Sequence, residues 1–338
     1  MRRLRELAGE ASRLFAVVKA NGYGHGAVDV ARAAIDAGAY GLAVVTIDEA
    51  IELRGVAEAG RILVMGPILP DEAAGAAESG FALTCSTPAQ ARALGEAAGS
   101  RTVPVHVKVD TGMSRYGALP QELDEIFAVL RTSGGLTLAG IWTHLATADS
   151  DAGFSRQQFQ ALLDRAPAGP AIRHVANSTA LIRHPEMALD GVRVGIAMYG
   201  CEDARMEPVM TLRARVGQIK EIAGGASVGY GRSWVATRPS RIATVTIGYA
   251  DGVHRARSNT GEVLIRGRRA PQIGRVSMDS LAADITGIPD VAVGDAVTIF
   301  GRDGEQTISA EEVAAWSGTI SYEVLTSVGT RVRRVYQE

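Results

Sequence analysis

Cysteine is scarce in this sequence, and neither sign of charge dominates it. The 338 residues include only two cysteines, Cys85 and Cys201, which excludes a disulfide framework and suits a reduced, cytoplasmic protein. The formal net charge of −2 gives no indication of binding to nucleic acid or to a membrane surface. No apolar run approaches the roughly 20 residues that span a bilayer. The arginine-rich start lacks the apolar segment of a secretory signal, so we expect a cytoplasmic location.

Apolar runs alternate with alanine-rich helical patterns over the first two hundred residues. These runs cover residues 14–18, 41–45, 61–66, 81–85, 103–109, 138–144, 172–177 and 193–200. Strands that alternate with helices indicate βαβ units and a parallel sheet. Eight units match a closed (β/α)8 barrel of the TIM type, and an open doubly wound sheet is the main alternative. A first helix is predicted by the helical spacing of Leu4, Leu7, Ala11 and Leu14.

The pattern changes after about residue 207, where short Val/Ile-rich runs are separated by glycine. These runs cover residues 212–222, 241–250, 262–267 and 295–301. They predict a mostly antiparallel β domain. One helix is expected at 309–318, because Ser309 and Glu312 form a capping-box pattern. We therefore predict an α/β protein with two domains, a (β/α)8 barrel over residues 1–208 and a C-terminal β domain over 209–338.

The stretch FAVVKANGYGHG, residues 15–26, joins a buried-looking strand to a lysine and a glycine-rich loop. The carboxyl ends of barrel strands face the active site, so Lys19 is expected at that rim. Apolar surroundings lower the pKa of an amine, which then attacks carbonyl groups to form a Schiff base. A solvated lysine is an equally good interpretation of Lys19 taken alone. The glycines and Tyr23 suit an anion or a cofactor, or alternatively a tight turn with positive φ.

The stretch HVKVDTGMSRYG, residues 106–117, places several charges on and beside one strand. Alternation puts His106, Lys108 and Asp110 on one face of this strand. That face is predicted to point into the barrel, because the neighbouring runs are apolar on both faces, and a solvated edge strand is the alternative. Arg115 follows on the loop, so two cations accompany one carboxylate. The additional anion is either a carbamate on Lys108 or a substrate carboxylate.

Three further runs end in polar residues that suit a binding site. These residues are His144 and Asp149, then His174, Asn177 and Ser178, and finally Arg193 and Gly195. A helix start with Ser/Thr caps is expected after Asn177, and helix starts bind anions. The loops after the last two strands of a barrel frequently bind phosphate. The pattern therefore predicts a phosphate-bearing cofactor that also needs a lysine.

Eight motifs together resemble the alanine racemases, which are pyridoxal 5'-phosphate enzymes with a barrel followed by a β domain. In order, the motifs are AVVKANGYGHG, KVDTGMSRYG, THLATAD, HVANSTA, VRVGIAMYG, IGYADG, GRVSMD and SYEVLTSVGTRVRRVY. They span nearly the whole chain, and their shared order is far more specific than any single motif. The resemblance implies a small amino-acid substrate, no metal, D-alanine production for peptidoglycan, and a homodimer with shared active sites.

The resemblance also implies a role for particular residues in catalysis and cofactor binding. Lys19 would carry the cofactor and act as one base, and Tyr249 would be the second base, supplied by the other subunit. Arg193 would face the pyridine nitrogen. The phosphate would be held by Tyr23, Ser178, Gly195, Ile196 and Tyr322.

The same resemblance implies which residues bind the substrate and which support the catalytic groups. Arg115 would contact the ring oxygen of the cofactor and the substrate carboxylate, and Met278 of the other subunit would offer its backbone N–H. A carbamylated Lys108 would orient Arg115. Supporting positions are His144, beside Tyr249 and Arg193, and Asp149 and Arg275, which would line the substrate entry.

The sequence departs from the family at a few points and leaves further functions open. Gly22 stands where alanine is usual, Ser277 stands where some members have cysteine, and the family normally begins with a further strand segment. A metal-dependent barrel hydrolase would instead use Lys108, His144 and His174 around two metals. The pattern also leaves open a non-catalytic protein that binds pyridoxal phosphate, and a racemase for serine or a broader range of amino acids.

Overall fold

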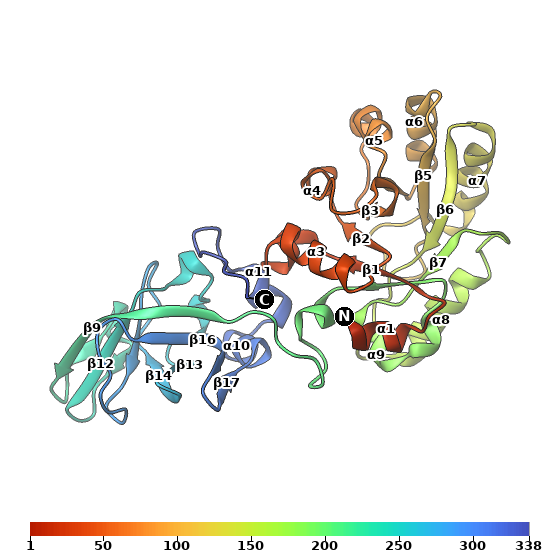
Figure 1. Cartoon of the computed structure of the whole chain (residues 1–338). Helices are drawn as coiled ribbons and strands as arrows, with labels where there is room; N and C mark the ends of the chain where they lie inside the picture. Colours follow the sequence, from red (N-terminus) through yellow and green to blue (C-terminus); the bar gives the residue numbers. More distant parts are fainter. Residues whose placement is uncertain (338) are drawn as a thin grey trace. The chain divides into compact units, whose positions relative to one another are not determined.

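The computed structural model describes residues 1–337, which form two compact units (Figure 1). The barrel unit comprises Met1–Gly22 and Gly26–Met198, and the sheet unit comprises Tyr23–His25 and Tyr199–Glu338. Within the described residues no helix is long and apolar enough to cross a membrane.

Eight parallel strands close the barrel unit in the order β1 to β8, because β1 pairs with both β2 and β8. The strands are β1 Arg13–Val17, β2 Gly41–Val44, β3 Ile62–Val64, β4 Ala82–Cys85, β5 Val103–Lys108, β6 Leu136–Trp142, β7 Ile172–His174 and β8 Gly191–Val194. The predicted barrel is confirmed, and the open doubly wound alternative is wrong. The closing register places Phe15 opposite Arg193, so the end of β1 lies beside the last strand.

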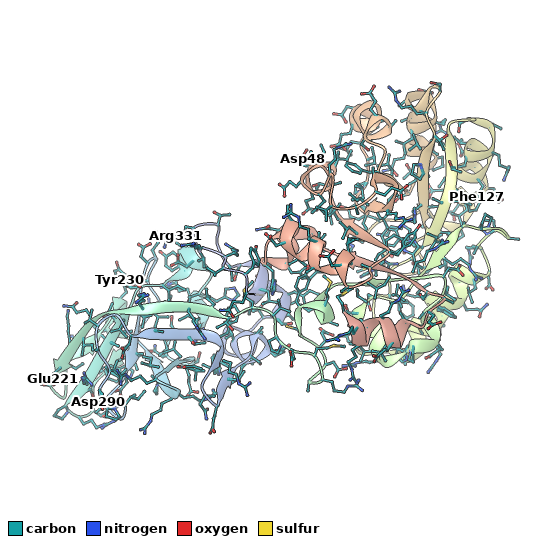
Figure 2. The ribbon with its side chains drawn as sticks, in the orientation of Figure 1. Asp48, Phe127, Glu221, Tyr230, Asp290 and Arg331 are labelled. Carbon is teal, nitrogen blue, oxygen red and sulfur yellow. The ribbon has the colours of Figure 1, made fainter. Side chains whose placement is uncertain are left out.

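The barrel strands form because their sequences are apolar on both faces. All residues of β2, β3, β4 and β8 are buried, as expected for parallel strands covered by helices outside and side chains inside. The barrel helices are α1 Arg2–Ala8, α2 Lys19–Tyr23, α3 Ala27–Asp36, α4 Ile47–Glu52, α5 Ala73–Ser79, α6 Pro88–Ala98, α7 Leu123–Thr132, α8 Ala152–Leu163 and α9 Ser178–Arg183. Helices α5, α6 and α7 pack beside one another outside the strands (Figures 1 and 2).

Two predicted boundaries in the barrel are wrong. The first helix ends at Ala8, because Gly9 follows with φ 75° and breaks the helical path, and Leu14 belongs to β1. The last run does not continue as a strand to residue 200. It leaves β8 after Val194 and forms a 3₁₀ turn at Ile196–Tyr199. The helical spacing of Leu14 and the apolar character of the last run therefore reflect burial rather than continuous secondary structure.

The sheet unit is built around a seven-stranded sheet in the order β13-β14-β15-β12-β9-β16-β17, and every pair is antiparallel. Its strands are β9 Leu212–Ile222, β12 Ser240–Val245, β13 Glu262–Ile265, β14 Arg268–Ile273, β15 Leu281–Asp284, β16 Ala296–Asp303 and β17 Gln306–Ile308, with β10 Ser227–Val228 and β11 Trp234–Val235 as a separate pair. The predicted antiparallel β character is confirmed. Helices α10 Ala310–Ser317 and α11 Ser321–Thr326 complete the unit.

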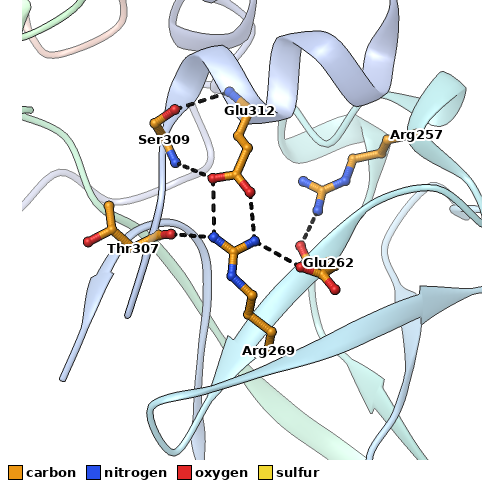
Figure 3. Close-up of polar contacts among 6 residues, drawn as sticks. All are labelled: Arg257, Glu262, Arg269, Thr307, Ser309 and Glu312. Carbon is orange, nitrogen blue, oxygen red and sulfur yellow. Dashed lines mark hydrogen bonds and ion pairs between the residues drawn. The ribbon is translucent and has the colours of Figure 1, made fainter. Parts of the chain in front are cut away.

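A cluster of charged residues ties α10 to the sheet (Figure 3). Arg269 of β14 donates hydrogen bonds to Glu262 at 2.8 Å and to Glu312 at 2.6 Å. Ser309 and Glu312 form the predicted capping box, so one glutamate both starts the helix and binds the sheet. Arg257 is fully buried nearby, donates to the backbone oxygen of Glu262, and has a pKa that burial lowers to about 10.

Candidate active site

Lys19 lies two residues beyond the end of β1 and is partly buried. Val18, which precedes it, donates a backbone hydrogen bond to Ala43, so the chain is held against β2 up to the lysine. Burial lowers the pKa of Lys19, the nearby Arg115 lowers it further, and Glu49 opposes both effects. An amine that is more readily deprotonated is a stronger nucleophile at neutral pH.

The chain after Lys19 makes a left-handed turn rather than an ordinary helix. Ala20, Asn21 and Gly22 have φ values of 51°, 54° and 61°. Such values are strained for residues with a side chain, whereas glycine adopts them freely. The turn is secured from inside, because Gly22 N–H donates to the carbonyl of Val18 and the side chain of Asn21 accepts from Ala27 N–H at 2.9 Å. The glycine-rich loop is therefore an ordered turn with positive φ.

Glu49 supports this turn, although no sequence motif pointed to it directly. One carboxylate oxygen accepts from Ala20 N–H at 2.7 Å, and the other accepts from Val45 N–H at 2.8 Å. The same carboxylate completes a capping box with Thr46 at the start of α4. The T-x-x-E pattern at 46–49 indicates a helix start, but its contact with the turn depends on the pairing of β1 with β2. Glu49 thus connects the residue after Lys19 to the second strand.

Arg193 of β8 is buried and is held by several acceptors. Its Nη1 donates to His174 Nδ1 at 3.0 Å and to the His174 carbonyl at 2.9 Å. Its Nη2 donates to the carbonyls of Thr143 and Val175 at 2.8 and 3.2 Å, and lies 3.4 Å from His144 Nδ1. The guanidinium therefore remains cationic in the barrel and has little freedom to move, although burial lowers its pKa to about 9.

His174 continues this row to His106, whose Nδ1 lies 2.9 Å from His174 Nε2. Because His174 Nδ1 accepts from Arg193, its proton lies on Nε2 and is donated to His106. Burial, followed by the charge of Arg193, lowers the pKa of His106 and His144 to about 3 and that of His174 well below its usual range. The three imidazoles are therefore neutral at physiological pH. His144 and His174 act as acceptors for Arg193, and His106 accepts from His174.

Lys108 is buried at the end of β5, as predicted, whereas the Asp110 carboxylate binds the following loop instead of pointing at Lys108. Burial and then Arg193 lower the pKa of Lys108 to about 8. Its Nζ lies 4.4 Å from the centroid of the Trp142 ring, a cation–π contact. The carboxylate of Asp110 accepts from three loop N–H groups at 2.9 to 3.0 Å and makes no ion pair with Lys108 in the described chain. It thus orders the loop that leads to the exposed Arg115.

Ser178, Gly195 and Ile196 form a buried corner in the barrel unit. The Ser178 hydroxyl oxygen accepts from Gly195 N–H at 2.9 Å and from Ala197 N–H at 3.3 Å, which leaves its own proton free to donate. The predicted Ser/Thr cap is wrong, because Asn177 caps α9 by accepting from Ala180 N–H. Because both amides donate to the hydroxyl oxygen, the Ser178 proton is the donor that suits an anion such as a phosphate.

An aromatic cluster in the sheet unit contains two of the predicted phosphate ligands. The Tyr23 ring lies 4.8 Å from that of Tyr199 and 6.0 Å from that of Tyr322, and His25 lies 4.6 Å from Tyr199. Burial raises the pKa of Tyr23 to about 12, so its hydroxyl stays protonated and remains a hydrogen-bond donor. The cluster fixes the direction of that donor by stacking.

Tyr249 and Met278 lie on two adjoining loops of the sheet unit, and both side chains are substantially exposed. Tyr249 N–H donates to the Ser277 carbonyl and Ala250 N–H donates to the Met278 carbonyl, each at 3.0 Å. Each hydrogen-bonded pair joins residues 28 positions apart, a contact that the sequence did not predict. Arg275 is also exposed, and its guanidinium lies against the backbone of Gly231.

The predicted site residues are divided between the two units. The barrel unit contains Lys19, Lys108, Arg115, His144, Asp149, Ser178, Arg193, Gly195 and Ile196, and the sheet unit contains Tyr23, Tyr249, Arg275, Met278 and Tyr322. Within the barrel, hydrogen bonds join His144 to Arg193 and Ser178 to Gly195. Asp149 is exposed, and its carbonyl accepts from Arg183.

The arrangement of the histidines argues against the metal-dependent hydrolase. His144 and His174 both direct Nδ1 at the Arg193 guanidinium, and His174 Nε2 faces His106, so these three nitrogens already have partners in the barrel. Residues 1–337 contain no cluster of three or more His, Cys, Asp or Glu side chains that could hold a metal ion.

Family models match nearly the whole chain. The model described as the N-terminal domain of alanine racemase matches residues 1–203, and the model for the C-terminal domain matches residues 209–336. A curated relative named alanine racemase, from Desulfosudis oleivorans, is 42% identical over 360 residues, which cover 98% of this chain and 92% of the relative.

Two solved structures are similar to this chain in fold as well as in sequence. Alanine racemase from Bacillus anthracis with bound L-Ala-P has a TM-score of 0.87 and 37% identity, and the match covers 98% of this chain and 89% of that one. Alanine racemase from Bartonella henselae with covalently bound pyridoxal phosphate has a TM-score of 0.89 and 31% identity, covering 99% and 95% of the two chains.

The neutral histidine row predicts a particular loss of stability in acid. Unfolded histidines bind protons below about pH 6.5, whereas the folded His106 and His144 resist protonation down to about pH 3. Burial and the charge of Arg193 also lower the pKa of His174 well below its usual range. The free energy of unfolding should therefore fall with pH below about 6.5, by up to about 1.4 kcal/mol per pH unit for each histidine. Urea unfolding at several pH values, followed by circular dichroism, measures this slope.

The matched variant is His106→Asn, which keeps an acceptor for the His174 proton but removes one titrating group. Its stability should depend on pH less steeply, by about one bound proton. An unchanged slope would show that His106 does not contribute to the acid sensitivity.

Proposed function

Because the chain belongs to the alanine racemase family, we propose that it interconverts L-alanine and D-alanine with pyridoxal 5'-phosphate and so supplies D-alanine for peptidoglycan. Members of this family are isomerases that depend on this cofactor. The observation that carries the proposal is Lys19, a partly buried amine with a lowered pKa after β1. Such an amine suits an aldehyde cofactor, which needs a nucleophile for covalent attachment.

The residues present fit such a cofactor. When bound, pyridoxal phosphate acidifies the α-proton of an attached amino acid by withdrawing electrons from the α-carbon. Ser178 keeps a hydroxyl proton to donate, and we assign its neighbours Gly195 and Ile196 as further phosphate ligands. Tyr23, with its protonated hydroxyl, and Tyr322 complete the proposed phosphate set. Arg193 is assigned to the pyridine nitrogen, where its fixed cation opposes protonation of the ring.

Two groups exchange the α-proton on opposite faces of the substrate. We assign one face to Lys19 Nζ and the other to the Tyr249 hydroxyl, since inversion requires removal on one face and return on the other. Arg115 and the backbone N–H of Met278 are assigned to the substrate carboxylate, with Asp149 and Arg275 at the entry. His144 supports Arg193 by accepting from its Nη2.

The active unit is proposed to be a cytoplasmic homodimer with two domains, 1–208 and 209–338. The two cysteines are free and buried, which suits a reducing compartment. The family models change between residues 203 and 209, which supports the boundary. Tyr249 and Met278 are assigned to the partner's cofactor, because the family resemblance places them there and both side chains are accessible.

The wild-type protein should convert L-alanine into a mixture of both enantiomers in the presence of pyridoxal phosphate, as measured by chiral chromatography. A panel of L-amino acids that includes serine tests the breadth of the reaction.

Lys19→Ala should lose both activity and the absorbance of the bound cofactor. Lys220, an exposed lysine of β9, provides the control, so Lys220→Ala should retain both. The assignment of Lys19 fails if Lys19→Ala still holds cofactor after borohydride reduction.

Lys108 should carry a carbamate. Its pKa of about 8 leaves a substantial neutral fraction near neutral pH, and a neutral amine adds carbon dioxide to form an N–C bond while releasing one proton. The product supplies the anion that Lys108, Arg115 and Arg193 lack. With ¹³C-labelled bicarbonate, nuclear magnetic resonance should show a carbamate signal that disappears in Lys108→Ala and persists in Lys220→Ala. A wild-type spectrum without that signal would contradict the proposal.

Shared active sites predict complementation between inactive subunits. Lys19→Ala and Tyr249→Phe should each be strongly impaired alone. In a mixed dimer one site collects both defects and the other collects neither, so activity should return. Differently tagged subunits verify exchange by co-purification. Proven exchange without recovered activity would mean that Tyr249 serves the cofactor of its own subunit.

A further inference from the structure

The side chains of Tyr249 and Met278 receive little packing in the sheet unit. They are 44% and 53% exposed, so burial within their own chain does not fix their positions. Their placement must instead come from the backbone of the two loops. The two hydrogen bonds from Tyr249 and Ala250 to the loop 277–278 make these segments one paired turn.

Gly248 allows this pairing to be close. A Cβ atom at this position would lie 2.2 Å from the Ser277 carbonyl oxygen and 2.3 Å from that of Met278. Real Cβ atoms do not approach oxygen so closely, so only glycine fits without moving one of the loops. The two loops therefore have a single relative arrangement as long as residue 248 is held in place.

Asp251 holds Gly248 in place from the end of the same turn. Its Oδ2 accepts from Gly248 N–H at 2.8 Å, and its side chain is only 12% exposed. Its backbone carbonyl accepts from Gly329 N–H at 3.2 Å, which joins the turn to the C-terminal segment. A largely buried carboxylate needs a counter-charge as well as the N–H group of Gly248.

Arg331 supplies that charge and reaches both loops, through Asp251 and Asp279. Its Nε lies 2.6 Å from Asp251 Oδ1, and its Nη2 lies 3.1 Å from Asp251 Oδ2. The same Nη2 lies 2.6 Å from Asp279 Oδ1, next to Met278. The planar guanidinium thus binds one carboxylate with two nitrogens and uses one of them to bind a second.

We propose that Arg331 is a positioning residue for the racemase reaction, because it sets Tyr249 relative to the Met278 backbone. This inference rests on the proposed function. Arg331 is half exposed, and exposed ion pairs contribute little to global stability. Its effect should therefore appear in the geometry of the two loops rather than in the unfolding temperature.

Arg331→Met removes both ion pairs, and Arg331→Lys keeps the charge but cannot bind Asp251 with two coplanar nitrogens. We expect kcat to fall by about 10-fold to 100-fold in Arg331→Met, because small displacements of a catalytic group have effects of this size. Arg331→Lys should fall between this variant and the wild type. The exposed Arg333 provides a control with the same change of charge, so Arg333→Met should keep wild-type rates.

An isotope effect distinguishes positioning from general damage. Only one of the two α-proton transfers uses Tyr249, so the α-deuterium effect in Arg331→Met should rise for one enantiomer of alanine and not for the other. The absorbance of the bound cofactor should be unchanged, because Lys19 is untouched. Equal isotope effects for both enantiomers, with reduced kcat, would overturn the proposal.

A second measurement does not depend on racemase activity. Amide hydrogen exchange at Tyr249 and Ala250 should become faster in Arg331→Met, because their acceptors lie on the loop that Asp279 anchors. Unchanged protection of these amides would also overturn the proposal. If hydrogen exchange becomes faster as expected but the wild-type protein racemises no amino acid, the role of Arg331 in ordering the two loops is retained and the proposed function fails.

Discussion

The burial of the Arg193 cation is the constraint on which the proposed cofactor site in the barrel depends. Within the described chain its guanidinium is satisfied by carbonyls and by the neutral rings of His144 and His174 rather than by a carboxylate. Its positive charge is consequently not cancelled locally. It contributes to the lowered pKa of Lys108, as does Arg115, which also lowers the pKa of Lys19. Such a concentration of positive charge favours ligands that bring negative charge, as phosphate and carboxylate groups do.

The neutral histidines give this cation a defined orientation at a cost in acid stability. Phe15 and Trp142 stack on the His174 ring, so the acceptor of Arg193 is held by packing as well as by hydrogen bonds. Gly140 leaves room for this row, because a Cβ atom there would lie 2.3 Å from His106 Nδ1. A carboxylate in place of His174 would bind Arg193 more strongly but would also neutralise it. The histidine therefore lets the arginine act on a ligand instead.

Much of the fold could be predicted because the barrel strands are apolar on both faces and alternate with helices. The positions of Lys19, Lys108 and Arg193 at or near the ends of β1, β5 and β8 could be predicted for the same reason. Long-range contacts could not be predicted in this way. His106 meets His174 only because the closed barrel places residues 68 positions apart on one interior layer. Asp110 turned out to order its own loop, since three local N–H groups were closer partners than the lysine.

The two groups assigned to proton transfer are held by different physical means. Lys19 is fixed by a buried strand and by a left-handed turn that Glu49 and Asn21 secure. Tyr249 has no such core around it and depends on hydrogen bonds between loops and on surface charges. Changes in the barrel core should therefore affect cofactor retention and stability together. Under the proposed roles, changes at Asp251 or Arg331 should act on one proton transfer and leave the barrel intact, so the two faces of the reaction should be separately alterable.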